Sequence, residues 1–336
     1  MISVVIPCRN EVKNIAECVE AIFASELDQS DEIEVLVVDG MSNDGTLEVL
    51  ESLQQRFASL KIIPNPQQVT PVAFNLGIKA ASGEYLQIIG ARQIISANYL
   101  REAKRSLTEN PEIGCVGGAV TNVYQTPESE IIGLAMSSSF GVGGGNFRVM
   151  KQSEFTDTVG TPMYPMAIFN EVGYFNEALL RNQDDEFNYR VTKSGKKILL
   201  NADIQIKYYV RAKVSNLFKQ YYQYGYWKVF VNKMHGAITN MRQLVPAVFV
   251  FGLLLGFILS WLHPVLAWMY ASALLLYILL AIYAGFSVAG AGIQAMRVAL
   301  IFPVLHFSYG WGYLRGLVDF FLLGKNPSRQ ASELSR

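Results

Sequence analysis

The residues Val38-Asp39-Gly40-Met41-Ser42-Asn43-Asp44-Gly45-Thr46 decide the fold of this chain, because they close a short, β-branched apolar run typical of a buried parallel strand. A second such run, Ile2–Pro7, leads into Cys8-Arg9-Asn10-Glu11. Open α/β sheets bind ligands at the carboxyl ends of their strands, so both polar clusters mark a candidate ligand site. A carboxylate there accepts hydrogen bonds from a base N–H or a ribose hydroxyl. Alternatively, Asp39 and Asp44 only form turns and cap the next helix.

Short apolar runs alternate with amphipathic segments along the first part of the chain. This alternation predicts an α/β fold with a mostly parallel sheet that helices cover on both faces. The expected strands are Ile2–Pro7, Glu34–Asp39, Lys61–Pro64, Tyr85–Ile89 and Gly114–Val120. The expected helices are Asn14–Ser25, Thr46–Phe57, Pro71–Ala81 and Ala97–Glu109.

The composition limits the class of protein. A length of 336 residues accommodates one catalytic domain with an appendage. The formal net charge is zero and there is no basic tract, so nucleic acid is not expected as a partner. The 3 cysteines lack metal-ligand spacing, and their odd number suits a reducing cytosol. Because the chain begins directly with a strand, no cleavable targeting segment is expected.

Between Arg242 and Arg297 the chain contains no Asp, Glu, Lys or Arg. A helix that crosses a bilayer needs roughly 20 apolar residues, and a soluble helix rarely runs so long without charge. We therefore expect an integral membrane protein rather than a soluble protein with a very apolar helical domain. The expected transmembrane helices cover about 244–262, 265–288 and 298–314, and the third is weaker because it contains Pro303 and several glycines.

The basic residues predict the orientation in the membrane. Several lysines and Arg242 precede the first span, whereas the His263-Pro264 turn carries no basic residue. By the positive-inside rule, residues 1 to about 240 lie in the cytoplasm, and the chain is a multi-pass protein of the inner (cytoplasmic) membrane. Three crossings would put Lys325 and Arg329 outside, which the same rule disfavours. The topology of the third segment therefore stays open.

Two segments outside these elements have unusual compositions. Leu217–Met234 interleaves aromatic residues with lysines, which favours an interfacial helix at the lipid headgroups; alternatively, its aromatics pack onto the catalytic domain. Phe140–Arg148 is rich in glycine but lacks the Lys-Ser/Thr of a P-loop. It is a weak candidate for a phosphate cradle, and it is at least as good a candidate for a mobile loop near a bound substrate.

Together the two polar strand ends resemble glycosyltransferase family 2, which has the GT-A fold. The family opens with V-V-I-P-x-x-N-E and continues with V-D-x-x-S-x-D-G-T, present here at Val4–Glu11 and Val38–Thr46. The likeness continues through Asn182–Glu186 and Gln223–Trp227 and covers most of the chain. It is greatest to bacterial enzymes of the succinoglycan or exopolysaccharide-synthesis type. The resemblance implies a GT-A (Rossmann-like) domain followed by α-helical transmembrane segments.

The resemblance also implies the residues that bind the nucleotide-sugar donor. They are Pro7, Arg9, Glu11, Asp39 and Asp44. Asp39 is expected at the edge of the base, and Glu11 is expected near the base or the ribose. A transferase further needs a partner for the departing diphosphate and a base for the acceptor hydroxyl.

The segment Asn182–Arg190 resembles the family's E-D-x-D/E-x-x-x-R element. In this alignment Asp184 takes the place of the catalytic aspartate, with Asp185 as the alternative, and Glu186 occupies a later position expected to contact the acceptor. By themselves, three consecutive acids are more often a solvated loop than a catalytic site. The two upstream motifs favour Asp184 as the general base.

Gln223-Tyr224-Gly225-Tyr226-Trp227 resembles the Q-x-x-R-W element of membrane-embedded synthases, with Tyr226 in place of the arginine. That element helps to bind the acceptor near the membrane. The resemblance therefore implies acceptor contacts at Gln223 and Trp227. Trp227 either stacks on a sugar face or only anchors the chain in the membrane.

The metal site departs from the family pattern. Family members hold Mg²⁺ or Mn²⁺ with D-x-D, or with D-A-H in the exopolysaccharide subset, at the end of the fourth strand. Here Tyr85–Ile89 runs into Gly90-Ala91-Arg92, so neither acid is present and no metal ligand is expected. Either Arg92 itself offsets the diphosphate charge, which we favour because the other site acids are retained, or the donor site has decayed.

The sequence thus predicts an inverting, membrane-anchored glycosyltransferase of exopolysaccharide or cell-surface glycan synthesis. It would transfer a sugar from a nucleotide-sugar, a UDP-sugar in our interpretation, to a polyprenyl-linked or nascent glycan. Alternatives are transfer directly to polyprenyl phosphate and a non-catalytic membrane scaffold. The expected domains are 1–212 (catalytic), 213–242 (interfacial), 243–318 (transmembrane) and 319–336 (polar tail).

Overall fold

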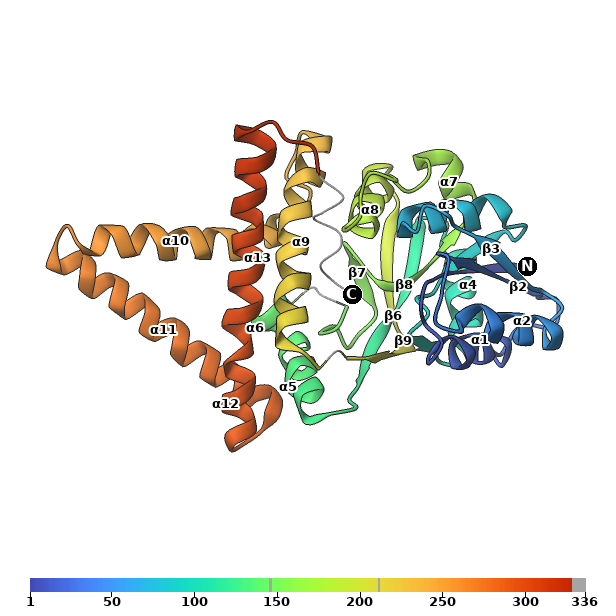
Figure 1. Ribbon diagram of the computed structural model, residues 1–336, viewed down its shortest axis with the longest axis horizontal. Helices are drawn as coiled ribbons and strands as arrows, with labels where there is room; N and C mark the ends of the chain where they lie inside the picture. Colours follow the sequence, from blue (N-terminus) through green and yellow to red (C-terminus); the bar gives the residue numbers. More distant parts are fainter. Residues whose placement is uncertain (145–146, 211, 328–336) are drawn as a thin grey trace. The chain divides into compact units, whose positions relative to one another are not determined.

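The computed structural model describes residues 1–144, 147–210 and 212–327 and forms two compact units (Figure 1). Unit 1 comprises Met1–Val123 and Gly145–Tyr209, and unit 2 comprises Tyr124–Gly144 and Val210–Arg336. The predicted catalytic domain was continuous, whereas the chain leaves unit 1 after Val123 and rejoins it after Gly144. Part of the glycine-rich segment (145–146) and the tail from 328, with Arg329, lie outside the described residues.

Unit 1 is built on a nine-stranded sheet with the order β3-β2-β1-β4-β8-β6-β9-β5, and β7 pairs with β9. Strands β1 to β4 are mutually parallel, as are β6 and β9, whereas β8 runs antiparallel between β4 and β6. The strands are β1 (Ile2–Cys8), β2 (Ile33–Asp39), β3 (Leu60–Pro64), β4 (Tyr85–Ile88), β5 (Gln93–Ile95), β6 (Ile113–Val123), β7 (Glu154–Thr156), β8 (Gly160–Pro165) and β9 (Lys197–Tyr209). The predicted mostly parallel α/β sheet is confirmed.

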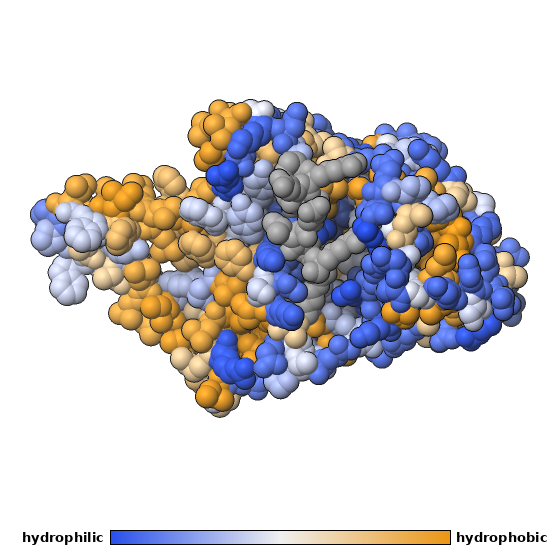
Figure 2. Space-filling model, viewed as in Figure 1, coloured by the Kyte–Doolittle hydropathy of each residue, from blue (hydrophilic) through white to orange (hydrophobic). Residues whose placement is uncertain are grey.

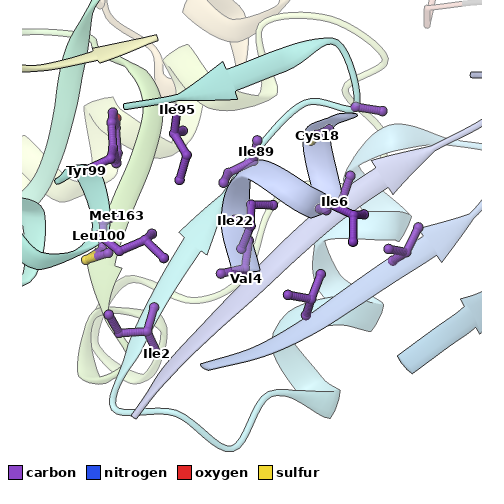
Figure 3. Close-up of a cluster of buried hydrophobic side chains, with 14 of the residues drawn as sticks. Ile2, Val4, Ile6, Cys18, Ile22, Ile89, Ile95, Tyr99, Leu100 and Met163 are labelled. Atoms are coloured by element: carbon purple, nitrogen blue, oxygen red, sulfur yellow. The ribbon is translucent and has the colours of Figure 1, made fainter. Parts of the chain in front are cut away.

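Helices cover both faces of this sheet, because its central strands are apolar on both sides. Successive residues of β1 enter different cores: Val4 and Ile6 belong to one buried cluster and Val5 to the other. Figure 3 shows the first cluster, where β1 residues lie with Cys18 and Ile22 of α1. The helices of unit 1 are α1 (Ile15–Phe23), α2 (Thr46–Arg56), α3 (Thr70–Ala80), α4 (Tyr99–Glu109), α7 (Ala167–Val172) and α8 (Gln183–Lys193).

Unit 2 is helical. Its helices are α5 (Pro127–Met136), α6 (Ser139–Val142), α9 (Val214–His235), α10 (Val245–Ser260), α11 (Pro264–Ala289), α12 (Ile293–Ala299) and α13 (Ile301–Leu317), with a 3-10 turn at Met241–Leu244 and a π turn at Val318–Leu322. The segment Tyr124–Gly144 belongs here because α6 packs on α13. The Phe140 ring meets the Phe302 ring edge-on at 5.1 Å, and the Phe140 carbonyl lies 2.8 Å from Nε2 of His306.

Helices α9 and α13 run side by side through glycine contacts (Figure 1). A Cβ on Gly225 would lie 2.0 Å from the Tyr309 carbonyl oxygen, and one on Gly312 would lie 2.1 Å from that of Tyr222. The segment predicted to be interfacial is thus largely a 22-residue helix, and its Tyr226 ring packs on Phe320 of the π turn that follows α13. The two alternatives drawn from the sequence were an interfacial helix and packing onto the catalytic domain, and neither alternative included α13 as a partner.

Helices α10 and α11 form an exposed apolar hairpin, seen in orange in Figure 2. In the described part of the chain, Met241–Ser260 and Pro264–Ala289 are the two helices long and apolar enough to cross a membrane, with only 11% and 6% of their apolar windows buried. A soluble core helix would be mostly buried, so we conclude that unit 2 is membrane-associated.

The expected third span, 298–314, is not a single apolar helix. Helix α12 ends at Ala299, α13 begins at Ile301, and α13 is not among the candidate spans. One face of α13 is buried and rich in small residues, including Ser308, Gly312 and Gly316. This face packs on α9. From the sequence, this segment was a weaker candidate for a third span, with its topology left open.

Candidate active site

The carboxyl ends of β1 and β2 form a pair of interlocked loops. The Asp39 carboxylate accepts a hydrogen bond from the Ser42 hydroxyl at 2.5 Å and another from the Ser42 N–H at 3.0 Å. The Ser42 hydroxyl in turn accepts the Asn10 N–H at 2.9 Å, and the Asn10 side chain accepts the Asn43 N–H at 3.0 Å. Asp39 is 5% exposed, so its carboxylate organises the loop that it begins.

Asp44 connects the same two loops from the exposed side. One carboxylate oxygen accepts the N–H and hydroxyl of Thr46, and the other accepts the Val12 N–H at 3.3 Å. The hydrogen bond from the Thr46 hydroxyl is the main cause that lowers the pKa of Asp44. The turn and capping role weighed from the sequence is therefore present. A direct nucleotide contact of Asp44 stays a prediction.

Arg92 lies where the chain leaves β4, and it is held by Glu11 from the end of β1. The Arg92 Nε donates to both carboxylate oxygens of Glu11 at 2.8 Å. The Asn14 side chain donates to the same carboxylate at 2.8 Å, and the Glu11 N–H donates to the Thr46 hydroxyl at 2.9 Å. This ion pair between a predicted nucleotide contact and the predicted diphosphate partner was not foreseen from the sequence.

Arg9 completes the edge. It directly follows β1, and Pro7 pairs with Val38 of β2 in the register of the sheet. The Arg9 Nε is buried and has no hydrogen-bond partner within the described residues. Because a buried donor without a partner is costly, it is available to a ligand. The structure thus brings together, at one sheet edge, the predicted residues Pro7, Arg9, Glu11, Asp39, Asp44 and Arg92.

Asp184 and Asp185 lie in the first turn of α8. The short connection Ser194–Lys196 returns the chain to the amino end of β9, so the amino end of α8 points back toward the carboxyl edge of the parallel strands. Asp184 is exposed, and its carboxylate accepts the Asp185 N–H at 2.9 Å; Asp185 is half-buried. The topology therefore puts Asp184 at the same sheet edge as the donor residues.

Glu186 has a different environment from its two neighbours. It is 2% exposed and forms an ion pair with Arg190, whose Nε and second terminal nitrogen lie 2.8 and 2.9 Å from its carboxylate oxygens. Arg190 also donates to the carbonyls of Val172 and Tyr174. This pair fixes the loop after α7, a structural role that the i, i+4 spacing of Glu186 and Arg190 could have indicated. The predicted acceptor contact at Glu186 stays a prediction.

Gln223 and Trp227 belong to unit 2, whereas the other predicted site residues belong to unit 1. Both are on α9, and helical geometry puts them on a different face from Gly225, which contacts α13. Their predicted acceptor contacts stay predictions.

The residues of the sheet edge do not fit a divalent cation. Gly90, Ala91 and Arg92 offer no carboxylate where the family pattern would supply one. All six carboxylate oxygens of Glu11, Asp39 and Asp44 already accept hydrogen bonds from protein donors. No cluster of three or more His, Cys, Asp or Glu that could hold a metal occurs in the described ranges. The position where the family pattern places the cation thus presents a guanidinium instead of carboxylate oxygens.

Comparison with known proteins matches residues 3–173 to the family described as glycosyl transferase family 2. The chain is 32% identical over 260 residues to dolichyl N-acetyl-alpha-D-glucosaminyl phosphate 3-beta-D-2,3-diacetamido-2,3-dideoxy-beta-D-glucuronosyltransferase of Methanococcus voltae, covering 75% of this chain and 80% of the relative. It is 27% identical over 322 residues to succinoglycan biosynthesis protein ExoA of Rhizobium meliloti, covering 94% and 95%.

Solved structures agree on the fold. The mannosyltransferase PcManGT from Pyrobaculum calidifontis, in complex with GDP-Man and Mn²⁺, superposes with a TM-score of 0.58 at 16% identity, covering 96% of this chain and 87% of that one. GalNAc-T7 with UDP, GalNAc and Mn²⁺ gives 0.52 at 14% identity, covering 63% and 44%. With its sheet, its strand-end motifs and these relatives, the chain belongs to glycosyl transferase family 2 and is a glycosyltransferase with the GT-A fold.

Proposed function

We propose that this glycosyltransferase moves a sugar, with inversion, from a nucleotide-sugar to a lipid-linked or nascent glycan in cell-surface polysaccharide synthesis. The observation that carries the proposal is the gathering of the donor residues and Asp184 at one edge of the sheet. The named relatives support the class of product, because one acts on a dolichyl phosphate-linked sugar and another takes part in succinoglycan biosynthesis.

The loops after β1 and β2 bind the nucleotide in this proposal. The unpartnered Nε of Arg9 donates to the nucleotide. Each carboxylate oxygen of Asp39 has a second lone pair beyond the one that Ser42 uses, so it accepts a hydrogen bond from a base N–H or a ribose hydroxyl. A UDP-sugar is the proposed donor, and UDP- and GDP-sugars are both included in the test below.

Asp184 is the proposed general base. Its exposed carboxylate is at the amino end of α8, where the helix dipole stabilises an anion. It removes the proton of the acceptor hydroxyl as that oxygen bonds to the anomeric carbon. The bond from this carbon to the diphosphate breaks in the same step, and the diphosphate leaves with the electron pair. One displacement of this kind inverts the anomeric configuration.

The membrane arrangement follows from unit 2. Helix α10 crosses α13 instead of running along it (Figure 1). Pro246 and Val250 both lie against Gly310 of α13, and the residues of α10 beyond Val250 are exposed or half-buried. If α10 and α11 cross the bilayer, α13 lies along its surface. An even number of crossings then returns Lys325 to the face of the lysine-rich α9, in agreement with the positive-inside rule. Unit 1 and the helices α9 and α13 of unit 2 are proposed to lie at the cytoplasmic face.

The test is sugar transfer into membrane lipids. Membranes from cells that produce the full chain are incubated with radiolabelled UDP- and GDP-sugars, and the label in extracted lipid is compared with that of Asp184→Asn and the neighbouring control Asp185→Asn. We expect Asp184→Asn to lose activity by about 10²- to 10⁴-fold and Asp185→Asn to lose far less. Loss confined to Asp185→Asn would reassign the base. An absence of label from every donor would refute the proposed UDP- and GDP-sugar donors.

A further inference from the structure

The leaving diphosphate carries negative charge that a transferase must offset. In this chain Gly90 and Arg92 stand where the family pattern has carboxylate ligands, and no cluster of three or more His, Cys, Asp or Glu that could hold a metal occurs among the described residues. The charge therefore has to be met by protein cations and N–H groups. Two guanidinium groups, of Arg9 and Arg92, stand at this sheet edge.

The geometry of Arg92 suits this task. Glu11 binds only its Nε, and within the described residues the two terminal nitrogens have no hydrogen-bond partner. The Arg92 side chain is 45% exposed, so these nitrogens are open to a ligand. A guanidinium offers parallel N–H groups that match two phosphate oxygens. One part of the group is thus anchored while the other can bind an anion.

Glu11 acts as the anchor of Arg92. Its carboxylate is 15% exposed, accepts a third hydrogen bond from Asn14, and is attached to a backbone that Thr46 holds. A long free arginine would lose side-chain entropy on binding an anion, and an arginine already held by Glu11 loses less. Because the pair is neutral as a whole, it attracts a diphosphate through directed N–H groups, and Arg9 supplies a second guanidinium with a buried N–H donor that has no partner among the described residues.

The turn that carries Arg92 is also held in place. The Gly90 N–H donates to the Gln93 side-chain oxygen at 2.6 Å, and the Thr161 hydroxyl donates to the same oxygen at 3.0 Å. Thr161 has a φ of +50°, which is strained for a β-branched residue. Strained residues of this kind persist where the surrounding structure requires a defined geometry, here beside the Gly90–Arg92 turn.

We infer that Arg92, positioned by Glu11, takes the place of a divalent cation at the donor diphosphate, so that nucleotide binding and transfer proceed without metal. The inference rests on the proposed function, because it assumes that a nucleotide-sugar is the donor. Arg92 touches the leaving group and is the catalytic residue; Glu11 is a positioning residue that acts through it.

The first test measures anion binding without turnover. Titration calorimetry on the purified full chain in detergent uses UDP and inorganic pyrophosphate, with EDTA or with Mg²⁺. We expect equal affinities in both buffers for the wild type, a loss of at least about tenfold for Arg92→Ala, and a smaller loss for Arg92→Lys. Arg56→Ala is the matched control, because Arg56 forms an exposed ion pair with Glu20 on the surface of unit 1. Binding that requires Mg²⁺, or that survives Arg92→Ala unchanged, would overturn the inference.

The second test separates positioning from simple stability. Glu11→Gln keeps an acceptor for the Arg92 Nε, whereas Glu11→Ala removes it. We expect pyrophosphate affinity to fall for Glu11→Ala and to be largely rescued in Glu11→Gln, with both proteins folded by circular dichroism. Equal affinities for the wild type and a folded Glu11→Ala would remove Glu11 from the proposal.

The third test restores the family pattern. The double variant Gly90→Asp/Arg92→His returns two metal ligands to the end of β4, and we expect its pyrophosphate binding to become dependent on Mn²⁺. Binding by this variant that is unaffected by EDTA would count against the substitution of a cation by Arg92.

The two proposals fail differently. Sugar transfer that EDTA abolishes and Mg²⁺ restores would refute metal independence and leave the glycosyltransfer intact. Metal-independent pyrophosphate binding through Arg92, with no transfer from any nucleotide-sugar, would refute the proposed donor and leave the anion site intact.

Discussion

Glu34, near the start of β2, shows how one residue holds the amino edge of the sheet together. Its carboxylate is 6% exposed and accepts hydrogen bonds from the Ser3 hydroxyl and from the N–H and hydroxyl of Ser82, each at 2.7 Å, and from Lys61 at 3.0 Å. Burial alone raises the pKa of Glu34, but these hydrogen bonds outweigh it and lower the pKa from 4.5 to about 2. Ionised Glu34 therefore stabilises the fold.

We expect Glu34→Gln to destabilise unit 1 by up to about 3 kcal/mol at neutral pH, because each unit of pKa shift corresponds to about 1.4 kcal/mol. The depressed pKa means that this stabilisation is fully present above pH 4.5 and is lost as the pH falls toward 2. Thermal unfolding of the detergent-solubilised chain should show a Tm difference at pH 7 that shrinks steadily below pH 4.5. A difference that does not change with pH, or one matched by the exposed Glu48→Gln, would contradict this assignment.

For individual residues, the sequence predicted the roles of side chains with nearby partners better than the roles of side chains whose partners are distant in the sequence. The turn chemistry of Asp39 and Asp44 follows from residues within three positions of each. The bonds of Arg92 to Glu11 span 81 positions, and only the assembled sheet brings these two residues together. Glu186 was predicted from a motif to contact the acceptor. Its burial depends on the loop after α7, which binds its partner Arg190, and the sequence pattern did not predict where this loop lies.

Among the helices, the contact between α9 and α13 depends on the close approach of the two backbones at glycine residues. We expect Gly312→Ala to cost about 1–3 kcal/mol, because its Cβ would lie 2.1 Å from a carbonyl oxygen of the neighbouring helix, which cannot move away like a flexible side chain. Gly225→Ala should behave alike. Gly252→Ala in α10 is the control, since a Cβ there meets nothing within 4 Å.

Melting temperatures in detergent, together with the retention of a monodisperse peak on gel filtration, would check this prediction. Equal stability for all three alanine variants would show that the two helices separate easily, contrary to the close approach in the structure.

The order of secondary-structure elements was predictable only where each strand alternates with its own helix. The strands and helices expected before Val120 are all present, within a few residues at their ends. The strands β5, β7, β8 and β9 were not predicted. The three-residue β5 and β7 form only by pairing with β9, and β8 inserts antiparallel between β4 and β6. Such long-range pairings leave little periodicity in the sequence.

For the molecule as a whole, the proposed topology has two membrane crossings. We expect a cysteine at His263→Cys, in the turn between α10 and α11, to react with a membrane-impermeant maleimide added to intact cells. A cysteine at Asn326→Cys should react only after permeabilisation. The native cysteines Cys8, Cys18 and Cys115 are buried, so they give little background. Labelling of Asn326→Cys from outside would instead support a third crossing by α13.

The segment Tyr124–Gly144, which belongs to unit 2 although both of its flanks belong to unit 1, affects how the catalytic part can be isolated. The backbone passes between the two units three times, after Val123, after Gly144 and after Tyr209, so three stretches of backbone connect them instead of one linker. A gene shortened to end at Tyr209 would still encode α5 and α6 without the helix that covers Phe140. Such a product should aggregate. A shortened gene in which a short polar loop also replaces Tyr124–Gly144 should yield a soluble enzyme fragment.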